Sequence, residues 1–413
     1  MATARSRPAG GGAGGGAGGG AGTSTAVRRV ATRERAGRPP DAPPRRRTWS
    51  RGPLWARIFV IIGALLMMGS GGTIICVKYL ISRYAGEVDQ RKFGGDAAVA
   101  HVDIKGEVNL LLVGIDERPD STEGTRADSI IVLHIPASHD KAYLISIPRD
   151  TYVQIPKYKD FRGSREKINA AFQYGGGPAG DGFDLLAQTV HLLTGVKFSG
   201  GAVVNFSGFR DIVDALDGVN MYVDEKVTSI HLGRDSSGKV VYPAFDINQD
   251  GTVGRQRPGI KPIVYEPGWH KFTGWQALDY CRQRDLLVDG DGDYGRQRHQ
   301  QQFLRAMIKE VTNKGLAKDP LKLDQVLRNT AKAFTFYGQG IRLEDWVFAF
   351  RDMDPGQITM VKTNGGKFSS QVLAGIGSVE IFTEESQQMF AALRGGDIDD
   401  FLLAHPDWVS GDQ

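Results

Sequence analysis

The sequence has 413 residues, of which 41% are hydrophobic and 24% charged, and its formal net charge is +4. That hydrophobic content is enough for a buried core, which excludes a largely disordered protein. Residues 1–57 contain twelve Arg and two acids, a net charge of +10, so the rest of the chain carries −6. The positive charge therefore belongs to one tail. A nucleic-acid-binding body with a basic face is disfavoured, and we expect no nucleic-acid partner.

The tail, residues 1–57, is predicted to be disordered. Residues 10–22 are almost entirely Gly and Ala, and residues 28–51 mix Arg, Pro, Ser and Thr with few apolar side chains. Such a segment buries too little apolar surface to offset the entropy lost on ordering. Its rich use of Ala, Gly and Arg indicates a GC-rich actinobacterial source.

An uncharged run of twenty residues, 58–77, predicts a transmembrane helix over 58–78. At about 1.5 Å per residue the run is roughly 30 Å long, the thickness of a hydrocarbon core. A buried globular helix is seldom uncharged for so long, and a cleaved signal peptide needs a shorter apolar region and a cleavage site. Basic residues are denser before the run than after it, so the positive-inside rule places the tail in the cytoplasm. We expect a single-pass type II plasma-membrane protein with residues 79–413 extracytoplasmic.

After a linker at 79–105, the pattern becomes that of an α/β domain. Short, apolar, β-branched runs predict strands at 109–115, 129–135, 142–147 and 219–223. Helical periodicity and capping residues predict helices at 167–175, 184–195, 207–218, 274–284 and 298–313. Because helices alternate with strands, we expect a mixed β-sheet sandwiched by helices. Two cysteines, Cys76 and Cys281, are too few for a disulfide scaffold or a Cys-based zinc site.

Charged side chains gather where these strands begin and end. Asp116 follows the strand 109–115, and Asp128 opens the strand 129–135. Separate segments bring further polar residues: Arg118, Arg126, Arg149, Arg282, Arg284, Arg296, Arg298 and Gln300. Ligands collect at strand ends in α/β sheets, and the guanidinium fork suits a pyrophosphate. Two carboxylates beside these arginines fit a hard cation such as Mg²⁺.

The alternative is that each Arg pairs with a nearby acid on a solvated surface. This explains any single Arg, but the local acids are too few for the whole set; they are Asp285, Asp289, Asp291 and Asp293. Asp150 has its own simple explanation, as a turn carboxylate that holds the loop carrying Arg149. Calcium loops at 246–251 and 289–295 are rejected, because the twelfth position of each is not Glu.

Seven motifs follow one another between residues 109 and 302: NLLLVGID, RADSIIVLHI, SIPRDTYVQIP, KINAAFQYGG, NFSGFRDIVDALDGV, GWQALDYCRQR and DYGRQRHQQQ. In this order they resemble the LytR–CpsA–Psr family of envelope phosphotransferases. The resemblance implies a catalytic core at 106–312, completed by 313–396, with a tail at 397–413. It also implies an apolar pocket for a polyprenyl tail. The implied activity moves a glycopolymer from a polyprenyl-pyrophosphate carrier to peptidoglycan at the membrane.

The resemblance also implies roles for individual residues. Asp116 and Asp128 match the acids associated with the metal, Mg²⁺ or, as the alternative, Mn²⁺. The positions associated with the pyrophosphate are Arg126, Arg149, Arg282, Arg284, Arg296 and Gln300. The candidate catalytic residues are Asp116, Arg149 and Arg284, with Asp116 the first choice of general base although metal ligation conflicts with that duty. Many family members have Arg where this chain has His299, and Cys281 is assigned no role.

Two other functions use the same residues. A regulator could bind polyprenyl-pyrophosphate intermediates without turnover, although the tail contains no periodic segment that predicts an output module. A pyrophosphatase would use water in place of the sugar hydroxyl. The transferred polymer stays open among arabinogalactan, teichoic acid and capsule, and the actinobacterial composition favours the first two.

Overall fold

The computed structural model describes residues 89–116, 124–248, 252–315, 334–350 and 353–411, together with Thr330. The predicted tail at 1–57 and the predicted transmembrane helix at 58–78 lie outside these ranges. Among the helices of the described ranges, none combines the length and the hydropathy needed to cross a bilayer.

The centre of the fold is a seven-stranded mixed sheet in the order β1-β15-β7-β2-β3-β4-β16. Strand β3 pairs antiparallel with both β2 and β4, whereas β7 pairs parallel with β2 and β16 pairs parallel with β4. The predicted mixed sheet is therefore confirmed. Its strands are β1 Asp89–Arg91, β15 Phe334–Tyr337, β7 Gly200–Asn205, β2 Val108–Ile115, β3 Ala127–Ile135, β4 Ala142–Ser146 and β16 Ile358–Lys362.

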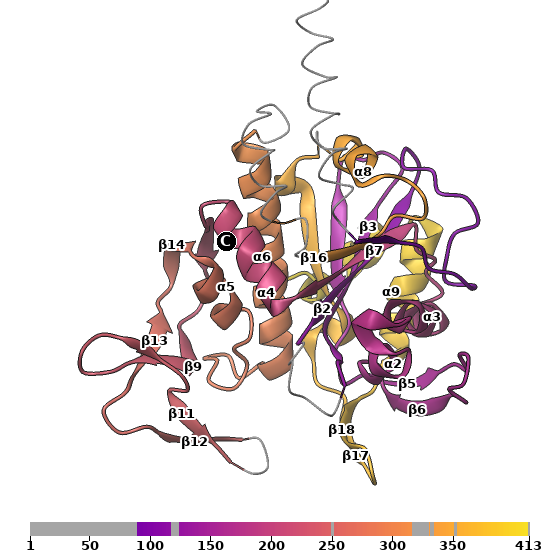
Figure 1. Ribbon diagram of the computed structural model, residues 1–413. Helices are drawn as coiled ribbons and strands as arrows, with labels where there is room; N and C mark the ends of the chain where they lie inside the picture. The colour runs from indigo at the N-terminus through magenta and orange to yellow at the C-terminus, as the bar shows by residue number, and fades with distance from the viewer. Residues whose placement is uncertain are drawn as a thin grey trace, which may run out of the picture. The chain divides into compact units, whose positions relative to one another are not determined.

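Helices cover both faces of this sheet (Figure 1). One face packs on α2 Ala170–Tyr174, α3 Gly182–Thr194, α9 Glu384–Gly395 and α10 Ile398–Ala404. Alternate residues of β2, Leu111, Val113 and Ile115, point into this core and are at most 2% exposed. The predicted helix 184–195 corresponds to α3, and Gly195 ends it in the left-handed conformation that its position predicts.

The other face of the sheet meets a second helical layer. Leu110 and Ile131 pack there with Trp346 of α8 Leu343–Ala349. The remaining helices are α4 Phe206–Ala215, α5 Gly274–Tyr280 and α6 Gly292–Asn313. A capping box begins α5, where the backbone N–H of Thr273 donates to Gln276 Oε1 at 3.0 Å, as the Thr273 cap predicts.

Small ribbons of strands extend from these layers (Figure 1). The pair β8–β14 packs its inner face on α5 and α6. The strands are β8 Val219–Val223 with β14 Gly268–Phe272; β9 Val227–Arg234 with β10 Val240–Val241 and β13 Lys261–Tyr265; β11 Phe245–Ile247 with β12 Val253–Gln256; β5 Tyr152–Ile155 with β6 Ser164–Lys167; and β17 Ser370–Leu373 with β18 Gly377–Glu380. Four 3₁₀ turns complete the described chain, η1 Gly177–Ala179, η3 Pro355–Gln357, η4 Thr363–Gly366 and η5 Pro406–Trp408.

Several segments differ from their predictions. Residues 89–105, predicted as linker, include β1 and bury Phe93 and Ala97 in the core. Residues 397–413, predicted as a tail, include α10 and bury Ile398 and Trp408 in the same core. Both segments are short and pack on residues that are distant in sequence. A search for local periodicity therefore does not reveal them. The first residue of the predicted helix 167–175 belongs to β6 and the next two form a turn, so α2 is shorter than predicted. Helix α6 begins six residues before its predicted start.

Candidate functional site

A pocket of about 700 Å³ is enclosed by the second face of the sheet and by the helices α4, α5 and α6. Its walls are largely apolar, because alternate residues of β2, β3 and β7 face it. The apolar lining includes Leu112, Ile131, Ala202, Val204, Phe206, Phe209, Ile212, Ile230, Ile247, Leu278, Leu304 and Met307. Such a surface favours an apolar ligand, whose burial releases water from both partners.

Helix α6 brings polar and apolar residues to this pocket along one face. Arg296, Gln300, Leu304 and Met307 all line it, and their spacing of four, four and three residues keeps them on one side of a helix. Gln300 Nε2 donates to the backbone oxygen of Cys281 at 3.2 Å, which ties α6 to the end of α5. Burial raises the pKa of the Cys281 thiol, so this residue stays protonated and contributes only its shape to the wall.

The two predicted metal-binding acids lie together on neighbouring strands. Asp116 directly follows β2, and Asp128 lies near the start of β3; both line the pocket. The register slips by one residue here, because Gly114 pairs with Ser129 and Ile115 with Ala127, which leaves Asp128 as the extra residue of a bulge. A bulge turns the extra side chain out of strict alternation, so Asp128 faces the pocket alongside Ser129.

Arg149 is held against Asp128 by a short ion pair. Its Nη1 lies 2.6 Å from Asp128 Oδ1, and its Nε lies 3.7 Å from Asp150 Oδ2. Lys167 Nζ lies 3.0 Å from the other oxygen of Asp150, so this carboxylate holds the loop as predicted. Burial lowers the pKa of Arg149, but the charges of Asp128, Asp293 and Asp150 outweigh it and raise that pKa.

Arg296 is the most buried of the pocket guanidiniums, with 6% of its surface exposed. Its Nη2 lies 2.7 Å from Asp293 Oδ1 and donates to the Asp128 backbone oxygen at 3.2 Å. Burial lowers the pKa of Arg296, and the nearby positive charges of Arg149 and Arg284 lower it further. Guanidiniums from three segments therefore feel one another's charge inside a single pocket.

Two donors of this cluster lack an acceptor. Within the described ranges, the buried Nε groups of Arg149 and Arg296 donate no hydrogen bond. A buried donor without an acceptor is costly, and the cost is greater beside like charges. A multivalent anion with several oxygens supplies both the acceptors and the opposite charge, so the cluster is suited to a phosphate or pyrophosphate.

The remaining predicted arginines have distinct surroundings. Arg282 lies over the ring of Phe206, with its guanidinium carbon 4.6 Å from the ring centroid, and Arg284 Nε lies 3.5 Å from Asp285 Oδ2. Both line the pocket. Arg126 donates from Nε to Gln173 Oε1 at 2.9 Å and is not among the pocket-lining residues. Arg118 belongs to the undescribed segment 117–123.

Local acids do pair with individual arginines, as the surface alternative expects. Asp128, Asp293 and Asp285 each approach one guanidinium. The set is nevertheless not a solvated surface, because Arg296 is buried, Arg149 has only 19% of its side chain exposed, and several members share one pocket with apolar walls. The tertiary structure therefore favours a binding site for an anion with an apolar portion.

The donor set at Asp116 and Asp128 fits the predicted Mg²⁺. Both groups offer hard carboxylate oxygens from adjacent strands in the same pocket as the guanidiniums. Mg²⁺ in proteins is commonly held by one or two carboxylates, with substrate phosphates and water completing the shell. Two carboxylates are therefore sufficient where a phosphorylated ligand binds beside them.

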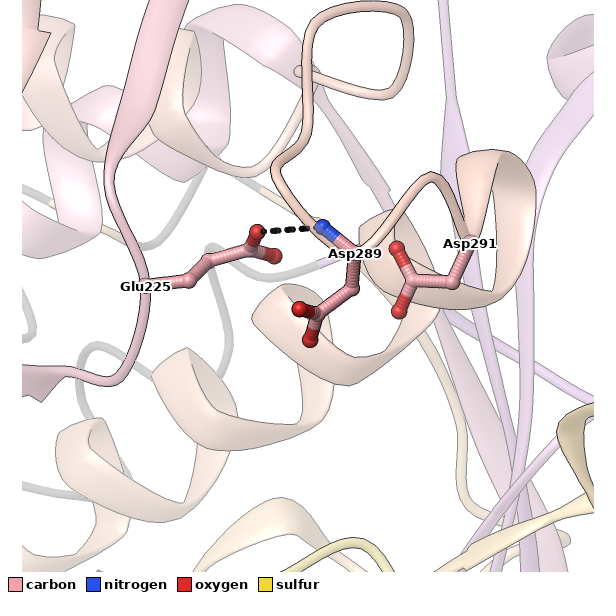
Figure 2. A group of neighbouring side chains, drawn as sticks. All are labelled: Glu225, Asp289 and Asp291. Carbon is pink, nitrogen blue, oxygen red and sulfur yellow. Dashed lines mark hydrogen bonds between the residues drawn. The ribbon is translucent and has the colours of Figure 1, made fainter.

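A second acidic group, Glu225, Asp289 and Asp291, lies outside this pocket (Figure 2). Arg298 occupies the position that a cation would take: its Nη2 pairs with Glu225 and its Nη1 with Asp291, and Nη2 is 4.0 Å from Asp289 Oδ2. Its Nε is 3.0 Å from Asp224 Oδ2. Because one guanidinium already supplies the positive charge, this group is structural, and Arg298 does not join the pocket cluster.

His299 belongs to the same buried network. It is fully buried, with Nε2 3.3 Å from Glu225 Oε1 and its ring 4.5 Å from that of Tyr280. It does not line the pocket. The replacement of the family's common Arg by His299 therefore affects buried packing of α6 and not the lining of the pocket.

Some pocket residues were not predicted from the sequence. Phe206, Phe209 and Ile212 of α4 form one apolar side, and Ser129 and Asp285 add polar groups. The spacing of the three α4 residues marks an apolar helix face, which was a usable signal. The spacing alone does not show whether that apolar face packs on the core or lines a cavity.

The sequence matches the family model described as the LytR_cpsA_psr family over residues 80–393. It is similar to the polyisoprenyl-teichoic acid–peptidoglycan teichoic acid transferase TagU of Bacillus cereus, with 29% identity over 259 residues, 61% of this chain and 70% of that protein. It is also similar to the probable cell wall biosynthesis protein LcpB of Corynebacterium glutamicum, with 29% identity over 245 residues. That match covers 56% of this chain and 48% of LcpB.

Solved structures share the fold. The crystal structure of B. subtilis TagV aligns with a TM-score of 0.51 at 20% identity, over 71% of this chain and 98% of that one. The structure of TagT bound to LI-WTA aligns with a TM-score of 0.51 at 20% identity, over 75% of this chain and 99% of that one. At such identities the likeness concerns the arrangement of the sheet and its helices.

The buried network around Arg298 predicts a pH-dependent stability. Burial raises the pKa of Glu225, but His299 and Arg298 outweigh burial and hold it below its ordinary 4.5. A depressed folded pKa stabilises the protein above pH 4.5, and this contribution is lost as pH falls through the folded pKa. Glu225→Gln should therefore lower the free energy of unfolding by about 2 kcal/mol at pH 7, and the deficit should shrink below pH 4.5.

Urea denaturation at a series of pH values measures this difference. The matched control is Glu266→Gln, because Glu266 forms an exposed 3.2 Å pair with Lys226 and should change stability by less than about 0.5 kcal/mol throughout. An equal deficit for Glu225→Gln at pH 3 and pH 7 would show that its charge does not stabilise the fold.

Proposed function

The chain belongs to the LytR_cpsA_psr family, and from this premise we propose that it is a phosphotransferase that moves a glycopolymer from a polyprenyl-pyrophosphate carrier to peptidoglycan. One observation carries the proposal: a single pocket joins a long apolar wall to buried guanidiniums that lack acceptors. A polyprenyl pyrophosphate has the same two parts, an apolar chain and a multivalent anionic head.

The apolar wall is proposed to take the polyprenyl chain. Side chains from β2, β3, β7, α4 and α6 form it, so it is built from rigid elements. Each CH₂ group that leaves water contributes about 0.8 kcal/mol to binding, whatever its orientation. The wall thus provides affinity for the carrier and leaves positioning of the head to the polar residues.

The polar residues are proposed to hold the pyrophosphate. Arg149 and Arg296 present unmatched Nε donors, and Arg282 and Arg284 add positive charge in the same pocket. Gln300 supports the site through its bond to the end of α5. Arg126, which is exposed and donates to Gln173, remains a proposed contact of the pyrophosphate. Fixed charges in an apolar pocket stabilise a phosphoryl group strongly, because little water screens them.

In the proposed reaction, a hydroxyl oxygen of peptidoglycan attacks the phosphorus nearest the polymer. A bond forms between them, the bond to the bridging oxygen breaks, and polyprenyl phosphate leaves with the electron pair. The carboxylate of Asp116 is proposed to take the hydroxyl proton. The guanidiniums of Arg149 and Arg284 neutralise charge that moves onto the leaving phosphate, which is the usual contribution of a protein to phosphoryl transfer.

Mg²⁺, with Mn²⁺ as the alternative, is proposed as the cofactor. Asp116 and Asp128 would hold it, and when bound it would neutralise charge on the pyrophosphate. If Asp116 serves as the base, Asp128 is left as the carboxylate that stays with the metal.

We predict that Arg149→Ala and Arg284→Ala each reduce transfer at least about 100-fold, because each removes positive charge from the phosphoryl site. Arg→Lys at either position should rescue poorly, since the planar fork is lost. The assay follows transfer of a radiolabelled polyprenyl-pyrophosphate saccharide to peptidoglycan fragments. Arg165→Ala, which changes an exposed arginine of β6, is the matched control. Full transfer by both pocket variants would remove these arginines from the mechanism.

A further prediction separates an enzyme from a lipid-binding regulator. Asp116→Ala and Asp128→Ala should abolish transfer while carrier binding largely survives, because the apolar wall is untouched. Wild-type transfer should require added Mg²⁺ and stop with EDTA, and the exposed Asp160→Ala should behave as wild type. Carrier binding by the wild type without turnover would favour the regulator, whereas release of polyprenyl phosphate without acceptor would favour a pyrophosphatase. Transfer that persists in EDTA would contradict the metal.

The proposed acceptor is outside the cell, so the proposal includes a type II topology with an N-terminal cytoplasmic tail and a plasma-membrane span at 58–78. A periplasm-type reporter, active only after export, should be active when fused after residue 413 and inactive when fused before residue 1. The reverse pattern would contradict the proposed activity, since the described domain would then lack access to peptidoglycan.

A further inference from the structure

A second groove lies on the side of α6 that faces away from the pocket. It has a volume of about 430 Å³ and is bounded by α6, by the ribbon β8–β14 and by the turn η3. Along α6, residues 300, 304 and 307 line the pocket, whereas residues 302, 305 and 309 line the groove. Figure 1 shows α6 as the long helix beside which α4 and α5 lie.

One wall of the groove is aromatic. Trp269 of β14 lies directly opposite Tyr222 of β8, and the two rings meet edge to face at 5.8 Å. The inner face of the same ribbon is filled by the buried residues Met221 and Phe272, so the aromatic pair is on the outer face. Trp269 is 69% exposed. An indole placed across from a second ring and left in water marks a surface that binds a ligand with an apolar face.

The floor of the groove needs hydrogen-bond donors. Gln302 Nε2 donates to Asp224 Oδ2 at 2.8 Å. Asp224 Oδ1 lies 3.9 Å from the buried His299 Nε2, on the side away from the groove, whereas Gln302 Oε1 is buried and receives no hydrogen bond from the described part of the chain. A ligand that brings a hydroxyl or amide N–H group would satisfy Gln302 Oε1, and the gain is larger because this oxygen is already removed from bulk water.

The charges around the groove are largely balanced. Four charged residues line the groove, two acids, Asp224 and Asp354, and two bases, Arg305 and Lys309. Asp224 pairs with Arg298 at 3.0 Å, and Arg305 Nε donates to the Pro355 backbone oxygen at 3.2 Å. Lys309 Nζ lies over the Trp269 ring, 5.9 Å from its centroid. A polyphosphate therefore finds no guanidinium cluster of the kind present in the pocket. The groove instead suits a neutral ligand that combines an apolar face with hydroxyl and amide donors.

A pyranose sugar has this combination, since its ring carries axial C–H groups on one face and hydroxyls around the edge. We propose that the groove binds a segment of a neutral glycan, the chain of N-acetylated hexoses that forms the acceptor strand of peptidoglycan. Trp269 stacks on one ring, and Gln302 accepts a hydrogen bond from its hydroxyl or acetamido groups. The proposal rests on the proposed transferase function, because it places the acceptor along the helix that also lines the reaction pocket.

The test is calorimetric titration of the full-length chain with a soluble hexasaccharide of β-1,4-linked N-acetylglucosamine. Trp269→Ala should raise Kd at least about tenfold, since truncation of a central aromatic contact typically has this effect, and Trp269→Phe should recover part of the loss. Gln302→Ala should also weaken binding. Leu403→Ala, which trims an 80% exposed residue of α10, is the matched control and should bind as wild type. Thermal unfolding of each variant checks that the fold persists.

The same variants separate this site from the transferase itself. Arg149→Ala should bind the hexasaccharide as wild type while failing in transfer, and Trp269→Ala should raise the KM for peptidoglycan acceptor with little change in kcat. If wild type transfers but Trp269→Ala changes neither Kd nor KM, the glycan groove is wrong and the transferase stands. If the hexasaccharide binds through Trp269 but no variant or wild type transfers, the groove stands and the transferase is wrong. Equal loss of binding in Leu403→Ala would also contradict the groove.

Discussion

The guanidinium of Arg298 fixes the helix on which both binding surfaces depend. It joins Asp224 and Glu225, at the turn between β8 and β9, to Asp291 at the start of α6. Buried charges must remain paired, because water cannot solvate them once the partner is removed. The helix is thereby held at one position between the sheet and the ribbon β8–β14. One of its sides then lines the pocket, and another lines the groove.

The pocket cluster shows the opposite balance of charge. Around Arg298 several carboxylates meet one guanidinium, whereas in the pocket Arg149 and Arg296 are close enough to lower the pKa of Arg296. Their nearby acids, Asp128 and Asp293, leave the two buried Nε donors unmatched. A folded protein retains such an arrangement when a ligand supplies the missing acceptors. The first network therefore stabilises the fold, and the second is arranged for an anion.

Much of the fold follows from local pattern. The runs at 109–115 and 129–135 predict β2 and β3, and the periodicity of 184–195 predicts α3 with its terminal Gly195. The segments that the sequence did not reveal, β1 and α10, are short and are stabilised by distant partners. Phe93 packs with Phe183 and Tyr337, and Asp399 of α10 accepts a hydrogen bond from the hydroxyl of Tyr143. Local periodicity carries no information about such contacts, because it describes which face of an element is apolar and not what covers it.

For the candidate site, too, the sequence established some features and the tertiary structure established others. The sequence by itself determined that Asp116, Asp128 and Arg149 lie near strand ends and that Arg284 and Arg296 belong to helical motifs of the same ordered series. Only the tertiary structure decided that Arg298 belongs to a separate network, that Arg126 contacts Gln173, and that Trp269 and Gln302 share a groove. All these groups are polar or amphipathic, and their chemistry is the same wherever they lie. Their partners are set by a one-residue bulge in β3 and by the rotation of α6, both of which depend on contacts between segments distant in the chain.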